Sequence, residues 1–426
     1  MRHQLSGRLL TVMAGILLTA VLWTGRGDWL GVAVAQEARK AVERHPLVVD
    51  RPPVRIIANP EPVFSAIAMD TQRGEVIITN DNESSPPSVL VYPAEFPPTD
   101  KVLEPRRRIT GSLHRLGLPC GVSVSPEYKE IYTVSGDDDF MNVFPLEANG
   151  DTPPTRRLSV AHGSGDVFLD PKNNELFITT EHVNKITVHR RTAQGEEDPL
   201  RYIQGPHTGL ADPHAIYVDN ETNEIFVTNH GHWRETKLGE GYGLVGDSKL
   251  ARKRGSQNPR YPDIPDPLGP STGKFMPPSI TFYPRTAQGD VAPLRTIQGS
   301  QTQMDLPLGV RRDSVSGQIV VANSGSDSVL FFDGNATGNV APVRVLKGPA
   351  TNLKSPTGIL IDTKRNELWV TSWENHTANV FPITAQGNVA PLRFIRSAAK
   401  GTTLSTLGRP GAVAYDPKRK EILVPN

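Results

Sequence analysis

Short apolar runs alternate with polar turns along most of the chain. One repeated phrase has an apolar run ending in Asp, a five-residue step to an acidic residue, a second apolar run and a small polar residue. Its seven copies lie at 67–80, 122–135, 167–180, 216–229, 310–323, 359–372 and 413–426. Because these runs are rich in β-branched and aromatic residues and are bounded by turn residues, they predict β-strands joined by hairpins.

A second phrase, Pro-x-Arg-x-Ile/Leu, also occurs seven times. Its copies lie at 53–57, 105–109, 154–158, 199–203, 293–297, 342–346 and 391–395. Further short apolar runs, such as 89–92 and 329–332, lie between the two phrases. Each unit of about 50 residues therefore contains four predicted strands, which is typical of one blade of a β-propeller.

The two ends of the repeat region predict how the ring closes. The last copy stops after its second strand at Asn426, whereas 47–57 precedes the first complete unit. We predict that 47–57 completes the sheet begun by 412–426, so that N- and C-terminal strands close the last blade. The expected fold is an all-β, seven-bladed β-propeller with four antiparallel strands per blade, in one domain over 47–426.

The second strands end in IITN, IYTVS, IFVTN and LWVTS, and runs such as VLVY and VLFF follow them. These segments resemble the NHL and YVTN-type repeats, and the architecture is similar to that of seven-bladed streptogramin-lyase-like and lactonase-like propellers. The resemblance implies the fold. It implies no single activity, because such propellers serve as binding scaffolds, lactonases and lyases.

The first 35 residues have the pattern of an export signal. Arg2 and Arg8 precede an apolar run over 9–23, and Ala33-Val34-Ala35 is a small-x-small cleavage site. The alternative is an uncleaved anchor, but the run is shorter than the roughly 18 apolar residues of a membrane span. We therefore expect a signal at 1–35, a linker at 36–46 and a periplasmic or secreted protein with no membrane span after cleavage.

Composition and charge narrow the classes of partner. The chain has 46 basic and 45 acidic residues, and this balance argues against nucleic acid as a partner. Its single cysteine, Cys120, excludes a disulfide framework. The 37 Gly and 38 Pro of the 426 residues fit a turn-rich fold. We expect a monomer whose partner is a protein, a glycan or a small molecule.

Residues that recur in every blade are expected to serve the scaffold. The Arg of the second phrase and the acidic residue of the first phrase begin strands at the same face, which we call the bottom. We predict structural Arg–Glu or Arg–Asp pairs within or between blades. The repeated Asp of the first phrase is expected to accept hydrogen bonds from the turn backbone.

Function is expected where the blades differ, at the opposite face, which we call the top. Residues at or after the ends of the second strands are the predicted ligand contacts: Asn80, Asp81, Asn229, His230, His232, Asn323 and Trp373. His214 begins the first strand of its blade, where other copies have Ser65, Cys120, Gly165, Leu308, Thr357 and Gly411.

These positions contain a candidate metal or catalytic site. His214, His230, His232 and Glu181 can supply the imidazole and carboxylate ligands of a divalent metal such as Zn, Mn or Ca. Such a metal can activate water or polarise a lactone carbonyl, with His214, His230 and Glu181 as catalytic candidates. The alternative is that these residues form solvated polar turns.

The fourth blade carries an insert at 231–278 that begins beside His230. A lid or partner-docking loop and a mobile decoration without a role are both compatible with it. Two functions remain. One is a binding scaffold that uses the top face and the insert, and the other is a metal-dependent hydrolase, lactonase or lyase. Because no ordered catalytic signature is present, the sequence favours binding.

Overall fold

The computed structural model describes residues 62–80, 86–111, 116–136, 138–181, 183–231, 276–400, 402, 414–416 and 421–423. Within these ranges the chain forms six four-stranded antiparallel sheets, one two-stranded sheet and three short 3-10 helices. The six four-stranded sheets are the blades of a propeller, numbered here in chain order.

Each blade contains four consecutive strands, paired in the order of the chain. Blade one contains β1 (Phe64–Asp70), β2 (Glu75–Asn80), β3 (Ser88–Pro93) and β4 (Arg107–Ile109); blade two contains β5 (Pro119–Ser125), β6 (Glu130–Ser135), β7 (Phe140–Pro145) and β8 (Arg156–Ser159). Blade three contains β9 (Ser164–Asp170), β10 (Glu175–Thr180), β11 (Lys185–Arg190) and β12 (Arg201–Ile203); blade four contains β13 (Pro213–Asp219), β14 (Glu224–Asn229), β15 (Ser279–Pro284) and β16 (Arg295–Gln298). Blade five contains β17 (Pro307–Arg312), β18 (Ile319–Asn323), β19 (Ser328–Phe332) and β20 (Arg344–Lys347); blade six contains β21 (Pro356–Asp362), β22 (Glu367–Ser372), β23 (Thr377–Pro382) and β24 (Arg393–Arg396).

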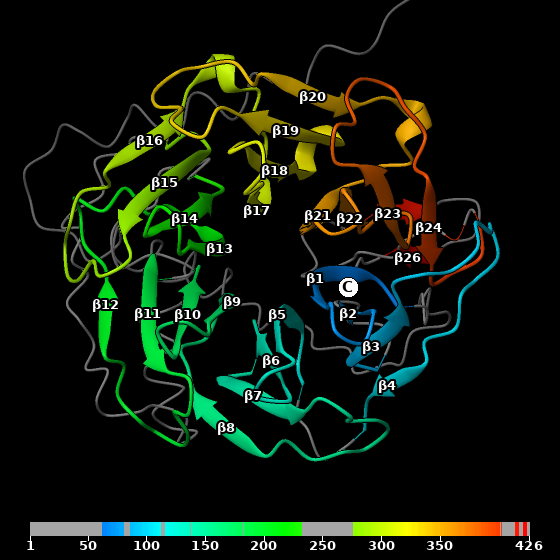
Figure 1. Ribbon diagram of the computed structural model, residues 1–426, viewed down its shortest axis with the longest axis horizontal. Helices are drawn as coiled ribbons and strands as arrows, with labels where there is room; N and C mark the ends of the chain where they lie inside the picture. Colours follow the sequence, from blue (N-terminus) through cyan, green and yellow to red (C-terminus); the bar gives the residue numbers. More distant parts are fainter. Residues whose placement is uncertain are drawn as a thin grey trace, which may run out of the picture. The chain divides into compact units, whose positions relative to one another are not determined.

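The first strand of every blade lies at the centre of the ring and the fourth at its rim (Figure 1). Consecutive inner strands contact one another around the ring, from β1 to β5 and onward to β21. Hydrophobic clusters fill the space between neighbouring sheets, such as the cluster of Tyr132, Met141, Leu158 and Leu176 between blades two and three. Burying both faces of the sheets in this way is the main source of stability.

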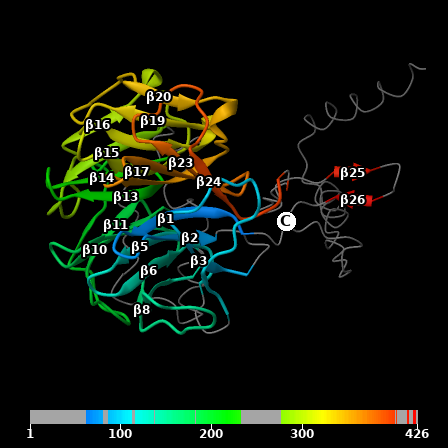
Figure 2. The same cartoon turned by 45° about the vertical axis from the view of Figure 1, so that its right-hand side comes forward.

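The ring closes with six blades, so the prediction of seven is wrong. Blade one (blue) lies directly beside blade six (orange) in both views (Figures 1 and 2). Thr371 Oγ1 donates a hydrogen bond to the carbonyl oxygen of Ser65 at 2.6 Å, and Phe64 and Trp369 belong to one hydrophobic cluster. Thr179 and Thr228 bond to the next inner strand at earlier junctions in the same way, so the last junction leaves no room for another blade.

The seventh copy of the repeat forms a hairpin instead of a blade. Its strands β25 (Ala414–Asp416) and β26 (Glu421–Leu423) pair with each other as a separate two-stranded sheet. Residues 47–57, which were predicted to complete this sheet, lie outside the described residues.

The repeated Asp holds the turn between the first and second strands, as predicted. Asp70 Oδ1 accepts hydrogen bonds from the backbone N–H groups of Gln72 and Arg73. The residue before the following Glu has positive φ, and this position is occupied by Gly, Asn or Lys, as in Gly74 and Asn174. Short polar side chains and glycine tolerate this left-handed conformation, which explains the invariant five-residue spacing.

The predicted pairs between repeated Arg and Glu residues are confirmed. In five blades the arginine that begins the fourth strand bonds to the glutamate that begins the second strand, in the pairs Arg107–Glu75, Arg156–Glu130, Arg201–Glu175, Arg295–Glu224 and Arg393–Glu367. In blade five Arg344 bonds to Gln318, which directly precedes the second strand. The same arginines donate to backbone carbonyl groups of the next blade, at Leu146, Arg191, Arg285, Ala336, Ala385 and Ala94. Each arginine therefore joins two blades, and Arg393 joins the last to the first.

Backbone hydrogen bonds reinforce these junctions at the rim. The turn before the fourth strand of one blade contains a glycine of positive φ, such as Gly289 with φ 74°. Gly289 forms a parallel bridge with Ile203 of the preceding blade, donating to Tyr202 and accepting from Gln204. Equivalent bridges at Gly150, Gly195, Gly338 and Gly387 explain the recurrence of this turn in the sequence.

The expected signal, linker and insert lie wholly or mostly outside the described residues. The two ends of the insert meet beside blade four, where a Cβ on Gly231 would lie 2.0 Å from the carbonyl oxygen of Met276. Glycine at 231 permits this close approach, with φ 82°. None of the helices that the structure describes has the length and apolarity to cross a bilayer.

We expect Arg201→Ala to destabilise the protein because it removes a largely buried arginine from the junction of blades three and four. The side chains of Arg201 and Glu175 are 11% and 12% exposed, and Arg285 still pairs with Glu175 in the variant. The free energy of unfolding should therefore fall by about 2–3 kcal/mol. This loss is smaller than when a buried charge is left with no partner, because Arg285 still compensates the charge of Glu175. Denaturant-induced unfolding measures this change.

Arg190→Ala is the matched control because Arg190 pairs with Glu197 at the surface, where its side chain is 58% exposed. It should leave stability nearly unchanged. Equal destabilisation by the two substitutions would contradict the scaffold role of Arg201.

Candidate functional site

Two rings of equivalent positions lie at the top of the inner strands. In every blade the first residue of the inner strand is opposite the last residue of the second strand, as in the pair Pro213 and Asn229. The residues that follow these inner positions are Ser65, Cys120, Gly165, His214, Leu308 and Thr357. The residues that follow the second strands include Gly136, Glu181, His230, Ser324 and Trp373. We call these two rings the top mouth.

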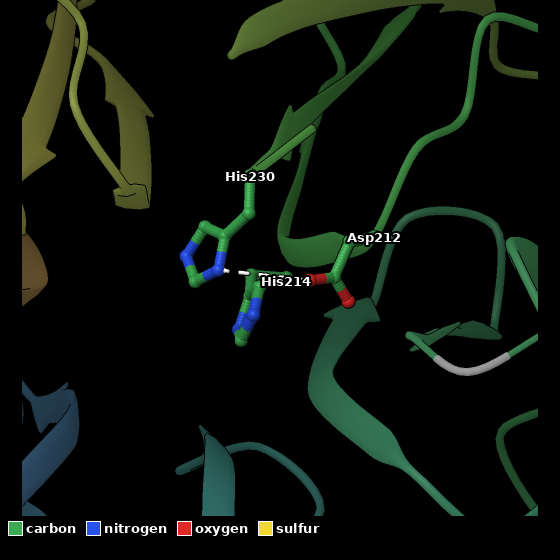
Figure 3. Close-up of side chains that lie close together, drawn as sticks. All are labelled: Asp212, His214 and His230. Atoms are coloured by element: carbon green, nitrogen blue, oxygen red, sulfur yellow. Dashed lines mark ion pairs between the residues drawn. The ribbon is translucent and has the colours of Figure 1, made fainter. Parts of the chain in front are cut away.

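Ionisable groups gather on one side of the top mouth, at blades three and four. His214 Nδ1 lies 3.0 Å from Glu181 Oε1, and the rings of His214 and His230 stack with centroids 3.5 Å apart. His230 Nδ1 lies 3.9 Å from Asp212 Oδ2, which comes from the loop before β13 (Figure 3). We call Glu181, Asp212, His214 and His230 the mouth cluster. Its side chains are 16–35% exposed, so solvent reaches the cluster while most of its surface is covered.

The fold fixes the backbone of the cluster. The N–H group of His230 donates to the carbonyl oxygen of Asp212 at 3.0 Å, and the N–H of Asp212 donates to Asn184 Oδ1 at 2.7 Å. The bond from His230 has counterparts in other blades, such as Trp373 to Ser355. These bonds belong to the scaffold, so they position the functional side chains without depending on them.

A bulge of the fold and one glycine direct two side chains into the top mouth. His214 lies where the pairing of β13 with β14 is irregular, between Pro213 and Ile216, and such bulges re-aim side chains. The other blades have the same irregularity at the start of their inner strands. Gly165 makes room for Glu181, since a Cβ at this position would lie 2.6 Å from Glu181 Oε1. A larger residue at 165 would displace the carboxylate from His214.

The electrostatics of the cluster place one proton on His214 in preference to His230. Burial lowers the pKa of His214, but the charge and hydrogen bond of Glu181, with Asp212 and Asp166, outweigh it and raise this pKa above 6.5. Burial and the charge of His214 hold the pKa of His230 well below its ordinary value. Two stacked imidazoles this close cannot both be charged at low cost.

Asp166 adds a further acidic group beside the cluster. Burial raises the pKa of Asp166 to about 6, although the charge of Arg311 and two backbone N–H donors oppose the rise. Those donors are Ile216 and Val167, at 3.1 and 2.9 Å. Asp166 therefore links blades three and four and contributes negative potential next to His214.

Among the described residues, Asp212, His214 and His230 can hold a metal ion. One ligand atom from each lies within 4.8 Å of the others. Two imidazoles and one carboxylate form a ligand set suited to divalent transition metals. Without a metal, the same cluster offers hydrogen-bond donors and acceptors, and His214 held by Glu181 has the arrangement of a general base.

The structure brings together three of the residues that the sequence predicted as metal ligands or catalytic groups: His214, His230 and Glu181. Trp373, which follows the second strand of blade six, occupies the position equivalent to His230 of blade four. By contrast, Asn80, Asn229 and Asn323 are buried and their amides bond within their own blades, for example Asn229 Oδ1 to the N–H of Ala211 at 3.0 Å. Asp81 and His232 lie outside the described residues.

Sequence reasoning did not identify Asp212 or Asp166 as part of this site. Asp212 lies in a loop that varies between blades, and its only signal is its position directly before Pro213 and His214. Asp166 is an acid within an otherwise apolar inner strand, which is an unusual position for a charge and was a usable signal.

A concavity at the bottom face of the junction between blades one and six has different chemistry. It has a volume of about 300 Å³ and is lined by residues that include Arg73, Arg106, Glu95 and Arg365. Two of its arginines already pair with carboxylates: Arg73 with Glu147 and Arg365 with Glu95. This concavity lacks the stacked imidazoles of the top mouth, and we place the functional site at the mouth.

No family model matches the sequence, and no curated protein matches it. The fold is similar to that of solved propellers. A chain of the hydrazine synthase of Kuenenia stuttgartiensis aligns with 88% of this chain and 98% of its own, at 11% identity and a TM-score of 0.50. A periplasmic gluconolactonase of Pseudomonas aeruginosa aligns over 82% and 89% at 12% identity and 0.47, and a chain of a nidogen/laminin complex over 80% and 99% at 12% and 0.41.

The similarity to the hydrazine synthase chain supports the fold alone. The more specific resemblance to NHL and YVTN-type repeats has no matching family model and stays a prediction.

We expect Glu181→Gln to lower the pKa of His214, because it removes the negative charge that stabilises the imidazolium. Since the pKa of His214 is raised in the folded protein, its contribution to stability is complete below pH 6.5 and is lost as pH rises through the folded pKa. NMR titration of the imidazole signals with chelator present measures the shift.

Glu197→Gln is the control for this titration, because Glu197 pairs with Arg190 at the surface. It should leave the pKa of His214 unchanged. An unaltered His214 titration in Glu181→Gln would contradict the pairing.

Proposed function

We propose that this protein is an exported binding propeller that takes a small polar ligand at the top mouth, through the mouth cluster. The proposal combines the export signal predicted from the sequence with the geometry of Glu181, Asp212, His214 and His230. Ligand sites generally combine an apolar setting with a few convergent polar groups, and this side of the mouth supplies such groups.

One observation carries the proposal. The mouth cluster occurs only at blades three and four of the six described blades, which otherwise have the same fold. At the position of His214 the other blades have Ser65, Cys120, Gly165, Leu308 and Thr357. At the position of His230, Gly136 and Ser324 are small. The fold therefore does not require ionisable groups at these positions. Because partial burial of carboxylates and imidazoles opposes folding, their concentration is best explained by a bound partner.

The opposite side of the mouth supports a ligand that is polar at one end only. Leu308 and Trp373 occupy ring positions in blades five and six. Trp373 Nε1 is buried and makes no hydrogen bond among the described residues. A ligand that reaches across the mouth can place polar atoms at the cluster and apolar atoms toward Leu308, with the indole N–H as a further donor.

A second function is favoured by the contact between His214 and Glu181. A histidine held at 3.0 Å by a carboxylate is the arrangement of a general base, which suits a hydrolase or lyase of the lactonase-like type. In that case His214→Ala abolishes turnover of lactone or ester substrates, whereas a binding protein shows no turnover with or without His214. Steady-state assays over a panel of lactones separate the two functions.

We expect a screen of small hydroxy acids, amines and sugars, run with chelator present, to find compounds that raise the melting temperature of the protein. Their effect should disappear in Glu181→Gln and His214→Ala, because these substitutions remove polar contacts in the mouth. Quenching of Trp373 fluorescence, assigned with Trp373→Phe, reports the location of binding.

His207→Ala is the matched control for this screen, since His207 forms an exposed pair with Asp290 at 2.6 Å. It should respond to the same compounds as the unmodified protein. Compounds that stabilise every variant equally would place binding elsewhere and contradict the proposal.

A further inference from the structure

The loops at the top of blade four hold three potential metal ligands on a rigid frame. His214 lies on β13, His230 directly follows β14, and Asp212 directly precedes β13. The backbone of His230 bonds to that of Asp212, and the N–H of Ala215 donates to Thr228 Oγ1 at 3.1 Å. Ligands on elements that are already fixed lose little conformational entropy when a metal binds.

The hydrogen bonding leaves suitable ligand atoms. Glu181 engages His214 at Nδ1, so Nε2 is the second nitrogen available from that ring. His230 Nε2 is buried and has no hydrogen-bond partner among the described residues. A buried nitrogen without a partner is unfavourable unless something occupies its lone pair or accepts its proton, and a metal ion satisfies the first condition.

The distances are close to those of a metal site. One nitrogen of each imidazole and one carboxylate oxygen of Asp212 lie within 4.8 Å of one another, whereas ligand atoms around tetrahedral zinc are about 3.4 Å apart for bonds of about 2.0–2.1 Å. Side-chain rotations that move each atom by less than about 1 Å close the difference, without movement of the backbone.

The charges also favour a divalent cation. Glu181 and Asp212 bring two carboxylates beside the stacked imidazoles of His214 and His230. A divalent ion held between these groups neutralises the two carboxylate charges. Imidazole nitrogens disfavour Ca²⁺ and Mg²⁺, which take oxygen ligands, and favour a transition metal such as zinc.

We propose that Asp212, His214 and His230 bind one divalent transition-metal ion at the top mouth, with Glu181 as the positioning carboxylate that orients His214. This inference deepens the proposed function, because three protein ligands leave a coordination position through which an oxygen- or nitrogen-bearing ligand can bind. The ligand set expected from the sequence was His214, His230, His232 and Glu181. The new set adds Asp212 and assigns Glu181 to the orientation of His214, while His232 lies outside the described residues.

The test is titration of the chelator-treated full chain with zinc and with cobalt. We expect one zinc ion per chain by calorimetry and one cobalt ion with the visible absorption of a nitrogen- and oxygen-ligated site. His214→Ala and His230→Ala should each weaken zinc binding by 100-fold or more. Asp212→Asn keeps the size of the side chain and tolerates the left-handed backbone at this position, φ 56°, and it should weaken zinc binding while the protein remains folded.

Glu181→Gln distinguishes a positioning residue from a ligand. It should lower zinc affinity by about 10–100-fold and keep both the stoichiometry and the cobalt spectrum, as expected for a group that orients a ligating histidine. A changed cobalt spectrum would assign Glu181 as a ligand and overturn its positioning role.

His207→Ala and His162→Ala are the matched controls, because each removes a histidine that lies near one aspartate, Asp290 or Asp139. Both should bind zinc as the unmodified protein does. Absence of stoichiometric metal, or retention of metal in folded Asp212→Asn and His230→Ala, would overturn the inference. The small-molecule screen contains chelator, so its outcome tests the proposed function separately from the metal.

Discussion

The arginine that begins each fourth strand is the interaction on which the ring depends. It pairs with the glutamate or glutamine of its own blade and donates to a carbonyl of the next, so one side chain fixes both the internal geometry of a blade and its junction. Where a glutamate is present, the pair is largely buried and hydrogen-bonded on both sides, and loss of one member leaves an uncompensated charge. The same contact from Arg393 to Ala94 closes the ring.

Because these arginine contacts stabilise the ring, the side chains of the top face are not needed to maintain the fold. The arginine pairs lie at the bottom and rim, whereas the top loops are tied by backbone bonds such as that between His230 and Asp212. Backbone bonds do not specify side chains, so blade four can carry imidazoles where other blades have residues such as Ser, Thr or Gly. The result is a frame whose backbone bonds do not depend on the partly buried imidazoles and carboxylates.

Most of the scaffold could be predicted from the sequence, because repetition exposes it. The four strands of a blade, the Asp that holds the first turn and the Arg–Glu pairs recur at fixed spacing, so chance agreement is excluded. The number of blades could not be obtained by the same method. The hairpin at 414–423 has the local pattern of a blade, and membership of the ring depends on packing between sheets that are distant in sequence.

The candidate site was predictable only in part, for a related reason. His214, His230 and Glu181 stand out because they break a repeat, and aligned positions lie at the same end of the ring. Asp212 lies in a loop without a repeated pattern, and only the folded backbone brings it to His230. The buried asparagines at the ends of the second strands show the converse: a polar residue at the top edge can belong wholly to the scaffold.

The most direct test of the central claim is the free energy of unfolding of a variant whose mouth cluster carries the residues of other blades: Glu181→Ser, His214→Thr and His230→Ser. If the cluster serves binding and not the fold, this variant is as stable as the unmodified protein or more so, because Thr357 and Ser324 already occupy these positions elsewhere in the ring. A loss of about 3 kcal/mol or more, as when a buried structural ion pair is broken, would show that the cluster holds blades three and four together and would contradict the claim.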